Sequence, residues 1–302
     1  MPRTSNTIVF FGTDSFSAAS LTRLIDEGFT IAAVVTKPDS RKGRGRALSS
    51  SLVKEIAQAH DIPVWQPTKL VDIAADIAQL DAPIGVLVSF GKIIPQSIID
   101  LFTPGIINVH PSLLPRYRGP SPIETAILHG DAETGVTLMQ LSAAMDAGPI
   151  YDQLTVPLHG TETAPELEAD LAERGAAQLC ALLPSIIDGS LQPTPQDDTQ
   201  ASYCALLSKD DSLLHPEQVS AVQAERQVRA YLTFPKTKVF ISPHTLVVTR
   251  VRVTAQPESA LDIRCSDGAY LAIDELIGPS GKRMSRSAFL NGYGATLHES
   301  QA

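Results

Sequence analysis

The sequence predicts an α/β protein with a mostly parallel open sheet and helices on both faces, followed by a smaller β-rich domain. Three observations favour this fold. Apolar, β-rich runs alternate with helical patterns through the first half of the chain, a polar stretch interrupts that rhythm near residue 190, and short alternating strands follow. The length of 302 residues also fits two domains.

The first half reads as four strand–helix pairs. The strands are expected at 8–11, 31–36, 84–90 and 106–110, and the helices that follow them at 16–27, 51–60, 95–102 and 122–128. A further strand is expected at 136–141. Ser121 with Glu124 forms a capping box at one helix start, and Thr163 with Glu166 opens a long helix. This alternation is typical of parallel strands joined by crossover helices.

Residues 188–205 are rich in Pro, Gln, Asp, Thr and Ser and show no apolar period, as in an exposed connector. We therefore expect a catalytic domain at 1–188, a linker at 189–207 and a C-terminal domain at 208–302. The last should contain a helix at 216–232 and strands at 238–241, 245–253, 261–265 and 269–273. Asp267-Gly268 is a hairpin-turn pair, so a small β-barrel or sandwich is expected.

Composition excludes several classes of protein. Apolar residues make up 43% and charged residues 19%, which is typical of a globular chain and not of a disordered or fibrous one. The three cysteines, Cys180, Cys204 and Cys265, stand far apart without a C-x-x-C pair, so a zinc knuckle or disulfide framework is not expected. The start lacks a secretory signal and no apolar run could span a bilayer. These features predict a cytoplasmic protein without a membrane partner.

The charge is unevenly distributed. The net charge of −9 argues against nucleic acid as a partner of the whole surface, but residues 209–302 contain 11 basic and 10 acidic residues. Two local basic features stand out. Four positive charges lie in one loop, on Arg41, Lys42, Arg44 and Arg46, and a predicted sheet face in the C-terminal domain carries Lys236, Lys238, Arg250 and Arg252. Each could contact phosphates or could simply be solvated.

The stretch 108–119, NVHPSLLPRYRG, is the most informative part of the sequence. The pleat of the strand places Asn108 and His110 on the same side, at a strand end that opens into the ligand crevice of an α/β sheet. An imidazole and an amide can stabilise an oxyanion or pass a proton without a metal. Asp146, in MDAG, could support His110 as a carboxylate, or could simply cap its own turn. A purely structural role for His110 also stays open.

A nucleotide cofactor is disfavoured. Gly12 follows the first strand, but FGTDSF lacks the G-x-G-x-x-G needed for close approach to a pyrophosphate, and the chain contains no Walker A sequence.

Four segments carry a family resemblance over essentially the whole chain: NVHPSLLPRYRG, MDAG, KPDSRKGRGRAL and DELIGPSGKRMSRSAFLNG. Together they resemble the methionyl-tRNA formyltransferases, within the family of 10-formyltetrahydrofolate-dependent formyltransferases. The N-x-H followed by SLLPxxRG indicates the formyl donor, and the GRG loop with a C-terminal domain resembling an OB fold points to a tRNA acceptor. The segment SRK at 40–42 and the Pro120-Ser121 pair depart from the usual family residues.

The resemblance implies a role for each group of residues. The catalytic trio falls on Asn108, His110 and Asp146, and the folate contacts fall on Ser112, Leu113, Leu114 and Pro115 and on Ser89, Phe90, Gly91 and Lys92. We expect transfer of a formyl group from 10-formyltetrahydrofolate to the α-amine of initiator Met-tRNA, by a monomer that uses no metal. The basic residues named above would contact the tRNA.

Two other functions stay open. A formyltransferase acting on a nucleotide amino-sugar would use the same donor chemistry, although it would not need a basic GRG loop. A folate-binding or tRNA-binding module without catalysis is the different class, and the intact trio counts against it.

Overall fold

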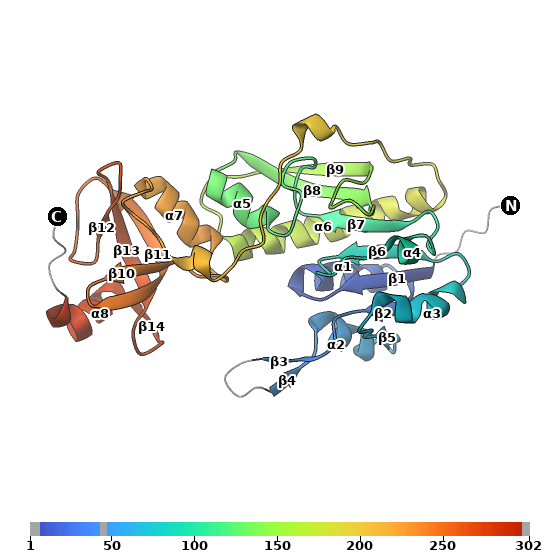
Figure 1. The fold of residues 1–302 in the computed structure, drawn as a ribbon, viewed down its shortest axis with the longest axis horizontal. Coiled ribbons are helices and arrows are strands. Elements are labelled where there is room, and N and C mark those ends of the chain that lie inside the picture. The colour runs from blue at the N-terminus through green and yellow to red at the C-terminus, as the bar shows by residue number, and fades with distance from the viewer. Residues whose placement is uncertain (1–6, 43–46, 298–302) are drawn as a thin grey trace. The chain divides into compact units, whose positions relative to one another are not determined.

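The computed structural model describes residues 7–42 and 47–297, and the chain divides into two compact units. Unit 1 comprises Met1–Pro122, Thr134–Pro157 and Glu168–Cys204, and unit 2 comprises Ile123–Glu133, Leu158–Leu167 and Ala205–Ala302. Each unit has a sheet of its own (Figure 1). The predicted domain boundaries at residues 188 and 208 stay a prediction.

Unit 1 is built on a seven-stranded sheet in the order β5-β2-β1-β6-β7-β8-β9. The strands are β1 (Thr7–Gly12), β2 (Thr30–Val35), β5 (Val64–Trp65), β6 (Ile84–Val88), β7 (Ile106–His110), β8 (Glu133–Gln140) and β9 (Ile150–Pro157). Neighbouring strands pair in parallel along the sheet from β5 through β2, β1 and β6 to β7, and β8 runs antiparallel to β7. The order of strands reverses between β1 and β6, so their carboxyl ends open the crevice in which ligands of such sheets bind.

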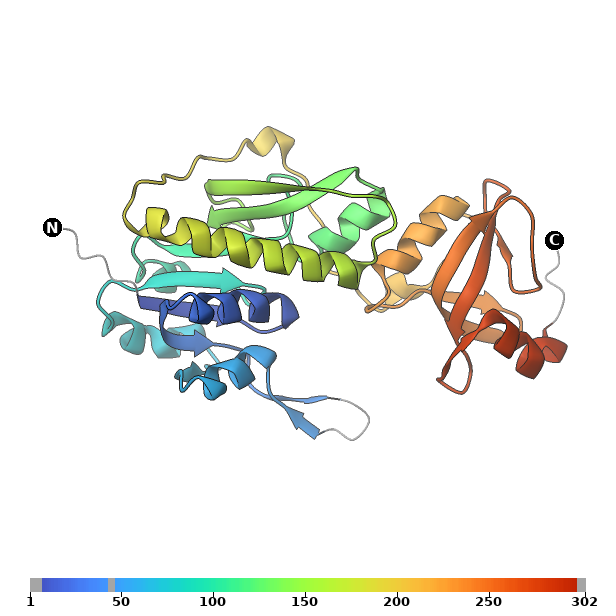
Figure 2. The ribbon, with the colours of Figure 1, turned by 180° about the vertical axis from the view of Figure 1, so that it is seen from behind.

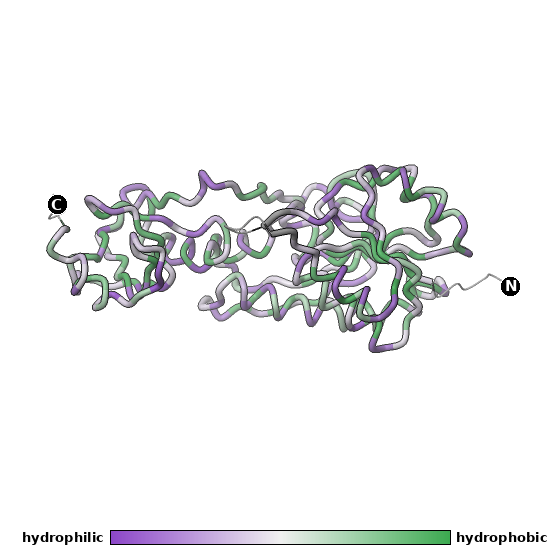
Figure 3. Tube along the Cα trace, turned by 90° about the horizontal axis from the view of Figure 1, so that it is seen from below, coloured by the Kyte–Doolittle hydropathy of each residue, from purple (hydrophilic) through white to green (hydrophobic). Residues whose placement is uncertain are grey.

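Helices cover both faces of this sheet. Figure 1 shows α3 (Ala74–Ala78) and α4 (Gln96–Ile99) in front of it, and Figure 2 shows α1 (Ser15–Asp26) and α6 (Ala164–Ile187) on the opposite face. Both sides of β1 are therefore buried, which explains its continuous apolar run. Val9 and Phe11 pack into the cluster that contains Ile77, Ile98 and Phe102. The strands of the sheet form the hydrophobic centre in Figure 3.

The predicted fold class is confirmed, including the four strand–helix pairs. The second helix is α2 (Leu52–Ala59) and the fourth is α5 (Pro122–His129). Several short elements were not predicted: β5, the turn η1 (Leu70–Ile73) with α3, and a hairpin of β3 (Ser40–Lys42) and β4 (Ala47–Ser49). Strands of two or three residues are too short to show an apolar period. Strand β9 was also missed, because only Tyr151 and Val156 of its side chains are buried.

Unit 2 contains a five-stranded antiparallel sheet, which confirms the predicted β-rich second domain. The strands are β10 (Lys238–Ile241), β11 (His244–Thr254), β12 (Ile263–Arg264), β13 (Tyr270–Ile277) and β14 (Arg283–Ser285). Its helices include α7 (Ala221–Ala230) and α8 (Arg286–Tyr293), and α5 belongs to unit 2 from Ile123 onward. The short turns η3 (Asp210–Ser212) and η4 (Gly294–Thr296) also lie in unit 2, whereas the turn η2 (Asp198–Gln200) belongs to unit 1. Leu246, Leu271 and Phe289 lie at the centre of the core of unit 2.

Two expectations for unit 2 need correction. The helix expected at 216–232 begins only after Ser220, whose hydroxyl accepts the Gln223 N–H in a capping box. Strand β11 has register irregularities on both sides of Arg250, which interrupt the simple alternation expected there. Beyond them the register is regular, but Val253 is 41% exposed while Val251 is buried. Asp267-Gly268 does form the predicted turn, with Gly268 at φ 82°. No helix within the described part of the chain is long and apolar enough to cross a bilayer.

Candidate active site

Strand β7 presents Asn108 and His110 at its carboxyl end. Both residues are 5% exposed. Val109, between them, points to the other face of the sheet, where Gly175 of α6 leaves it room. The pleat of the strand therefore places the amide and the imidazole on the same side, as the sequence predicted.

Asp146 joins these two residues from the loop between β8 and β9. Its Oδ1 accepts a hydrogen bond from Asn108 Nδ2 at 3.4 Å, and its Oδ2 accepts the Gly119 N–H at 2.9 Å. His110 Nδ1 lies 3.8 Å from the same Oδ2. The three residues of the predicted trio thus come together, although 38 residues separate Asn108 from Asp146.

The two ring nitrogens of His110 have different neighbours. Nε2 lies 3.0 Å from the Tyr117 carbonyl oxygen, which can only accept, so Nε2 is assigned the hydrogen. Nδ1 faces the Asp146 carboxylate at a distance longer than a hydrogen bond. Nδ1 is therefore the nitrogen that can serve a reacting group, on the side of the ring that faces the Asp146 carboxylate.

The predicted folate segment 112–115 is held in place by its own polar groups. The Ser112 hydroxyl donates to the Arg116 carbonyl oxygen at 2.7 Å, and the Ser112 carbonyl oxygen accepts from Thr137 Oγ1 at 2.6 Å. Gln153 donates to the Leu114 carbonyl oxygen at 2.8 Å. The side chains of Ser112 and Leu114 are buried, whereas Leu113 and Pro115 are partly exposed. Only the latter two present side-chain surface to a ligand.

The second predicted folate segment, 89–92, follows β6. The Ser89 hydroxyl donates to the Asp14 carboxylate, and Phe90 packs edge-to-face on Phe11. Gly91 is exposed at φ 66°, where an added Cβ would lie 2.5 Å from Lys37 Nζ. Lys92 Nζ donates to the Pro67 carbonyl oxygen at 3.2 Å. The turn therefore presents its backbone at the crevice, next to Lys37.

Asp14 and Lys37 are residues that the sequence reasoning missed. They follow β1 and β2, and the rule that ligands bind at the carboxyl ends of parallel strands could have found them. Their position next to Ser89 and Gly91 makes them part of the same crevice edge.

The predicted phosphate-binding residues fall into two groups. In the loop, Arg41 and Lys42 lie in β3, whereas Arg44 and Arg46 lie outside the described residues. In unit 2, Lys236 is exposed and Lys238 is half-buried. Arg250 forms an ion pair with Glu275, and Arg252 pairs with both Glu258 and Asp274. Carboxylates therefore offset much of the charge that was expected on the sheet face.

A further group reaches the trio from residues 194–204. Gln196 Nε2 donates to the carbonyl oxygens of Asp146 and Gly148, and Gln196 Oε1 accepts from Arg118. Burial opposes the charge of Arg118, but hydrogen bonds with Asp198 and Tyr203 outweigh it and raise the pKa of the guanidinium. A separation of 78 residues between Arg118 and Gln196 left no sequence signal for this contact.

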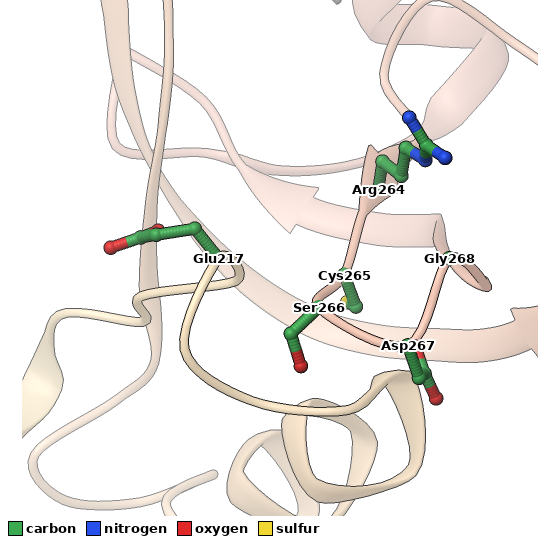
Figure 4. Close-up of a pocket in the computed structure, with 6 residues that line it drawn as sticks. All are labelled: Glu217, Arg264, Cys265, Ser266, Asp267 and Gly268. Atoms are coloured by element: carbon green, nitrogen blue, oxygen red, sulfur yellow. The ribbon is translucent and has the colours of Figure 1, made fainter.

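A separate pocket of about 540 Å³ lies in unit 2, lined by Glu217, Arg264, Cys265, Ser266, Asp267 and Gly268. Figure 4 shows Glu217 and Arg264 extending in opposite directions rather than toward a common point. The Asp267 carboxylate accepts the Ala221 N–H at 3.3 Å, at the start of α7, so it already has a hydrogen-bond partner. The pocket contains none of the predicted site residues.

Comparison with known proteins identifies the family. A model of the family described as formyl transferase matches residues 5–183. The chain is 37% identical over 300 residues to the methionyl-tRNA formyltransferase of Pelobacter propionicus, covering 95% of this chain and 93% of that protein. It is 38% identical to the enzyme of the same name from Thiobacillus denitrificans, over 94% of this chain and 96% of that one.

Solved structures share the fold at lower identity. A sugar 3N-formyl transferase, determined in the presence of dTDP and 5-N-formyl-THF, matches with a TM-score of 0.67 and 22% identity, over 88% of this chain and 97% of that chain. HypX from Aquifex aeolicus in complex with tetrahydrofolic acid matches with a TM-score of 0.66 and 17% identity, over 97% of this chain and 48% of that chain.

Proposed function

The chain belongs to the methionyl-tRNA formyltransferases of the formyl transferase family, and on that premise we propose that Asn108, His110 and Asp146 carry out the group transfer. The enzyme transfers the formyl group of 10-formyltetrahydrofolate to the α-amine of methionine on initiator tRNA, which produces formylmethionyl-tRNA for translation initiation. One observation carries the assignment of the site. The Asp146 carboxylate accepts the Gly119 N–H while it faces both Asn108 and His110.

Asn108 and His110 stabilise the charge that develops on oxygen. When the amine attacks the formyl carbon, the carbonyl oxygen becomes an oxyanion that needs hydrogen-bond donors. The Asn108 amide and a proton on His110 Nδ1 supply them, each contributing about 2–4 kcal/mol by the precedent of oxyanion holes. The Tyr117 carbonyl oxygen fixes the ring through Nε2, so that Nδ1 keeps its direction.

Asp146 serves the proton transfer. The neutral amine forms the new C–N bond and loses a proton, the bond between the formyl carbon and N10 of the folate breaks, and that nitrogen takes up a proton. Asp146 is 17% exposed and can relay this proton through water while it sustains a cationic His110.

The donor is placed along the two segments described above. Leu113 and Pro115 supply apolar surface, and the exposed backbone at Ser89 and Gly91 supplies hydrogen-bonding groups for the pterin ring. The turn at Gly91 supports this assignment, because a glycine at this position allows the backbone to lie close to the side-chain amine of Lys37.

The remaining assignments concern the acceptor. Residues 1–188 form the catalytic domain and residues 208–302 the tRNA-binding domain, joined by 189–207. The basic residues at 41–46 lie near the acceptor end of the tRNA, and Lys236, Lys238, Arg250 and Arg252 contact its backbone. The enzyme acts as a monomer in the cytoplasm, where initiator tRNA is charged.

An acceptor assay tests the function. The enzyme is given 10-formyltetrahydrofolate with Met-tRNA, free methionine or a nucleotide amino-sugar, and the formylated amine is identified. We expect product with Met-tRNA alone. Formylation of the amino-sugar would support the alternative, and no product with any acceptor would refute the proposed reaction.

A further inference from the structure

We propose that Gln196 is a positioning residue that holds Asp146 in place for the transfer. This inference rests on the proposed role of Asp146. The side-chain amide of Gln196 links the two parts of the site that must meet, namely the loop after β7 and the turn between β8 and β9. Nε2 donates to the Asp146 carbonyl oxygen at 2.8 Å and to the Gly148 carbonyl oxygen at 2.7 Å.

The other end of the same amide binds Arg118. Gln196 Oε1 accepts from Arg118 Nε at 3.1 Å and from Nη2 at 2.7 Å. Both donors and both acceptor positions of the amide are therefore used. The partners also fix its orientation, because a flipped amide would place its oxygen against two carbonyl oxygens.

Arg118 is a rigid anchor for this contact. Its side chain is only 3% exposed, and its backbone is held on both sides by residues 202–204. The Arg118 N–H donates to the Ser202 carbonyl oxygen at 2.9 Å, and the Cys204 N–H donates to the Arg118 carbonyl oxygen at 2.8 Å. The neighbouring Gly119 N–H binds the Asp146 carboxylate. Asp146, Gln196, Arg118 and Gly119 therefore close a ring of contacts.

The turn that carries Asp146 needs such a restraint. Asp146 has φ 47°, in the left-handed region that non-glycine residues rarely adopt, and Met145 beside it is exposed. Two carbonyl groups of this turn converge on one amide. Thr194 exchanges two backbone hydrogen bonds with Ile150, the first residue of β9 (Figure 1), and residues 202–204 bind Arg118. The segment is thus fixed on both sides of Gln196.

The test uses two variants of the full-length enzyme. Gln196→Ala removes the whole bridge, and Gln196→Glu keeps an acceptor for Arg118 but places a carboxylate oxygen against the two carbonyl groups. We expect both to lower kcat by about 10- to 100-fold, because a small displacement of a reacting group has effects of this size. KM for Met-tRNA and for the folate donor should change little.

Asp198→Asn is the matched control. Asp198 also accepts from Arg118 Nη2 at 2.7 Å, the nitrogen that donates to Gln196 Oε1, but its side chain is 80% exposed and the amide oxygen of Asn can replace the carboxylate as acceptor, so kcat should be retained. The decisive measurement is Gln196→Ala in an Asp146→Asn background. If Gln196 acts through Asp146, the second substitution should produce no further loss of kcat.

The outcomes separate the two proposals. If Asp146→Asn alone keeps the wild-type rate, the proposed catalytic role of Asp146 fails. If Asp146→Asn is slow but both Gln196 variants keep kcat, or if the losses multiply in the double variant, the positioning role is overturned and the proposed function stands. Melting curves accompany each assay. If neither Gln196 variant folds, Gln196 is a stability residue and the proposal is also overturned.

Discussion

At the level of single residues, the carboxylate of Asp146 does two things at once. Its Oδ2 is held by the Gly119 N–H, which orients the group, while Oδ1 lies beside the Asn108 amide and Oδ2 beside the His110 ring. The same carboxylate can thus orient two donors and accept a proton through water. A neutral amide at this position would keep the shape but lose the charge.

We therefore expect Asp146→Asn to lower kcat by at least ~10²-fold, with His110→Ala showing a loss of similar size. Binding of a folate analogue should survive in both, because the interactions removed strengthen only with the charge of the transition state. Steady-state kinetics and equilibrium binding measure the two quantities. Asp152→Asn, an exposed carboxylate in the same unit, is the control. A near-wild-type rate for Asp146→Asn or His110→Ala would remove that residue from the mechanism.

Some contacts of the site could be predicted from the sequence, and others could not. Strand alternation was enough to place Asn108 and His110 on one side, because the pleat is a local property. The meeting of His110 with Asp146 depends on how β7 and β8 pair, and the contact of Gln196 with Arg118 depends on a loop that returns to the sheet. Neither follows from local pattern. Ser112 stays a predicted folate contact, and its hydroxyl donates to the Arg116 carbonyl oxygen.

At the level of elements, the strands of unit 2 are tied together by a cluster of four charges. Arg252 of β11 binds Glu258 and Asp274, and Arg286 at the start of α8 binds the same two carboxylates. Two hydrogen-bonded guanidinium groups hold the pKa of Glu258 down to about 2. The cluster joins β11, β13, α8 and the loop that follows β11.

This shift predicts a pH dependence of stability. Because the folded state lowers the pKa of Glu258, the ionised form adds stability above the ordinary value near 4.5, and this contribution is lost as the pH falls toward 2. We expect Glu258→Gln to have a lower free energy of unfolding than the wild type at pH 6. The difference between the two proteins should become smaller below pH 4.5. Urea unfolding between pH 6 and 3 measures this difference in the free energy of unfolding, and Glu217→Gln, at an exposed position, is the control. A gap that does not change with pH would contradict the assignment.

At the level of the whole molecule, the acidic chain must attract an acidic RNA through local surfaces. A fragment that ends at Cys204 would not be a clean test of which surfaces bind the RNA. Residues 123–133 and 158–167 belong to unit 2, where Arg226 binds the His129 carbonyl oxygen and Arg229 binds the Glu162 carbonyl oxygen. Truncation would remove these partners, so substitutions in the full-length chain are the sounder test.

Charge pairing ranks the four basic residues of unit 2 that were predicted to contact the tRNA. Arg252 is matched by two carboxylates, and Arg250 shares Glu275 with Arg283. Lys236 and Lys238 take part in none of these ion pairs. We therefore expect the lysines to contribute more to binding the tRNA backbone than Arg252 does.

The full-length variant Lys236→Gln/Lys238→Gln should bind tRNA more weakly, and the slope of log K against log salt should become shallower by about one for each phosphate that the variant no longer neutralises. Its affinity for a folate analogue should be unchanged, because no residue of the folate segments is altered. Arg252→Gln should leave the slope nearly as it is and instead lower the stability of unit 2, since its charge is already neutralised by Glu258 and Asp274. If the lysine variant keeps the wild-type salt slope, unit 2 does not hold the RNA through these residues. The tRNA would then have to be held by other positive groups, such as Arg41 and Lys42.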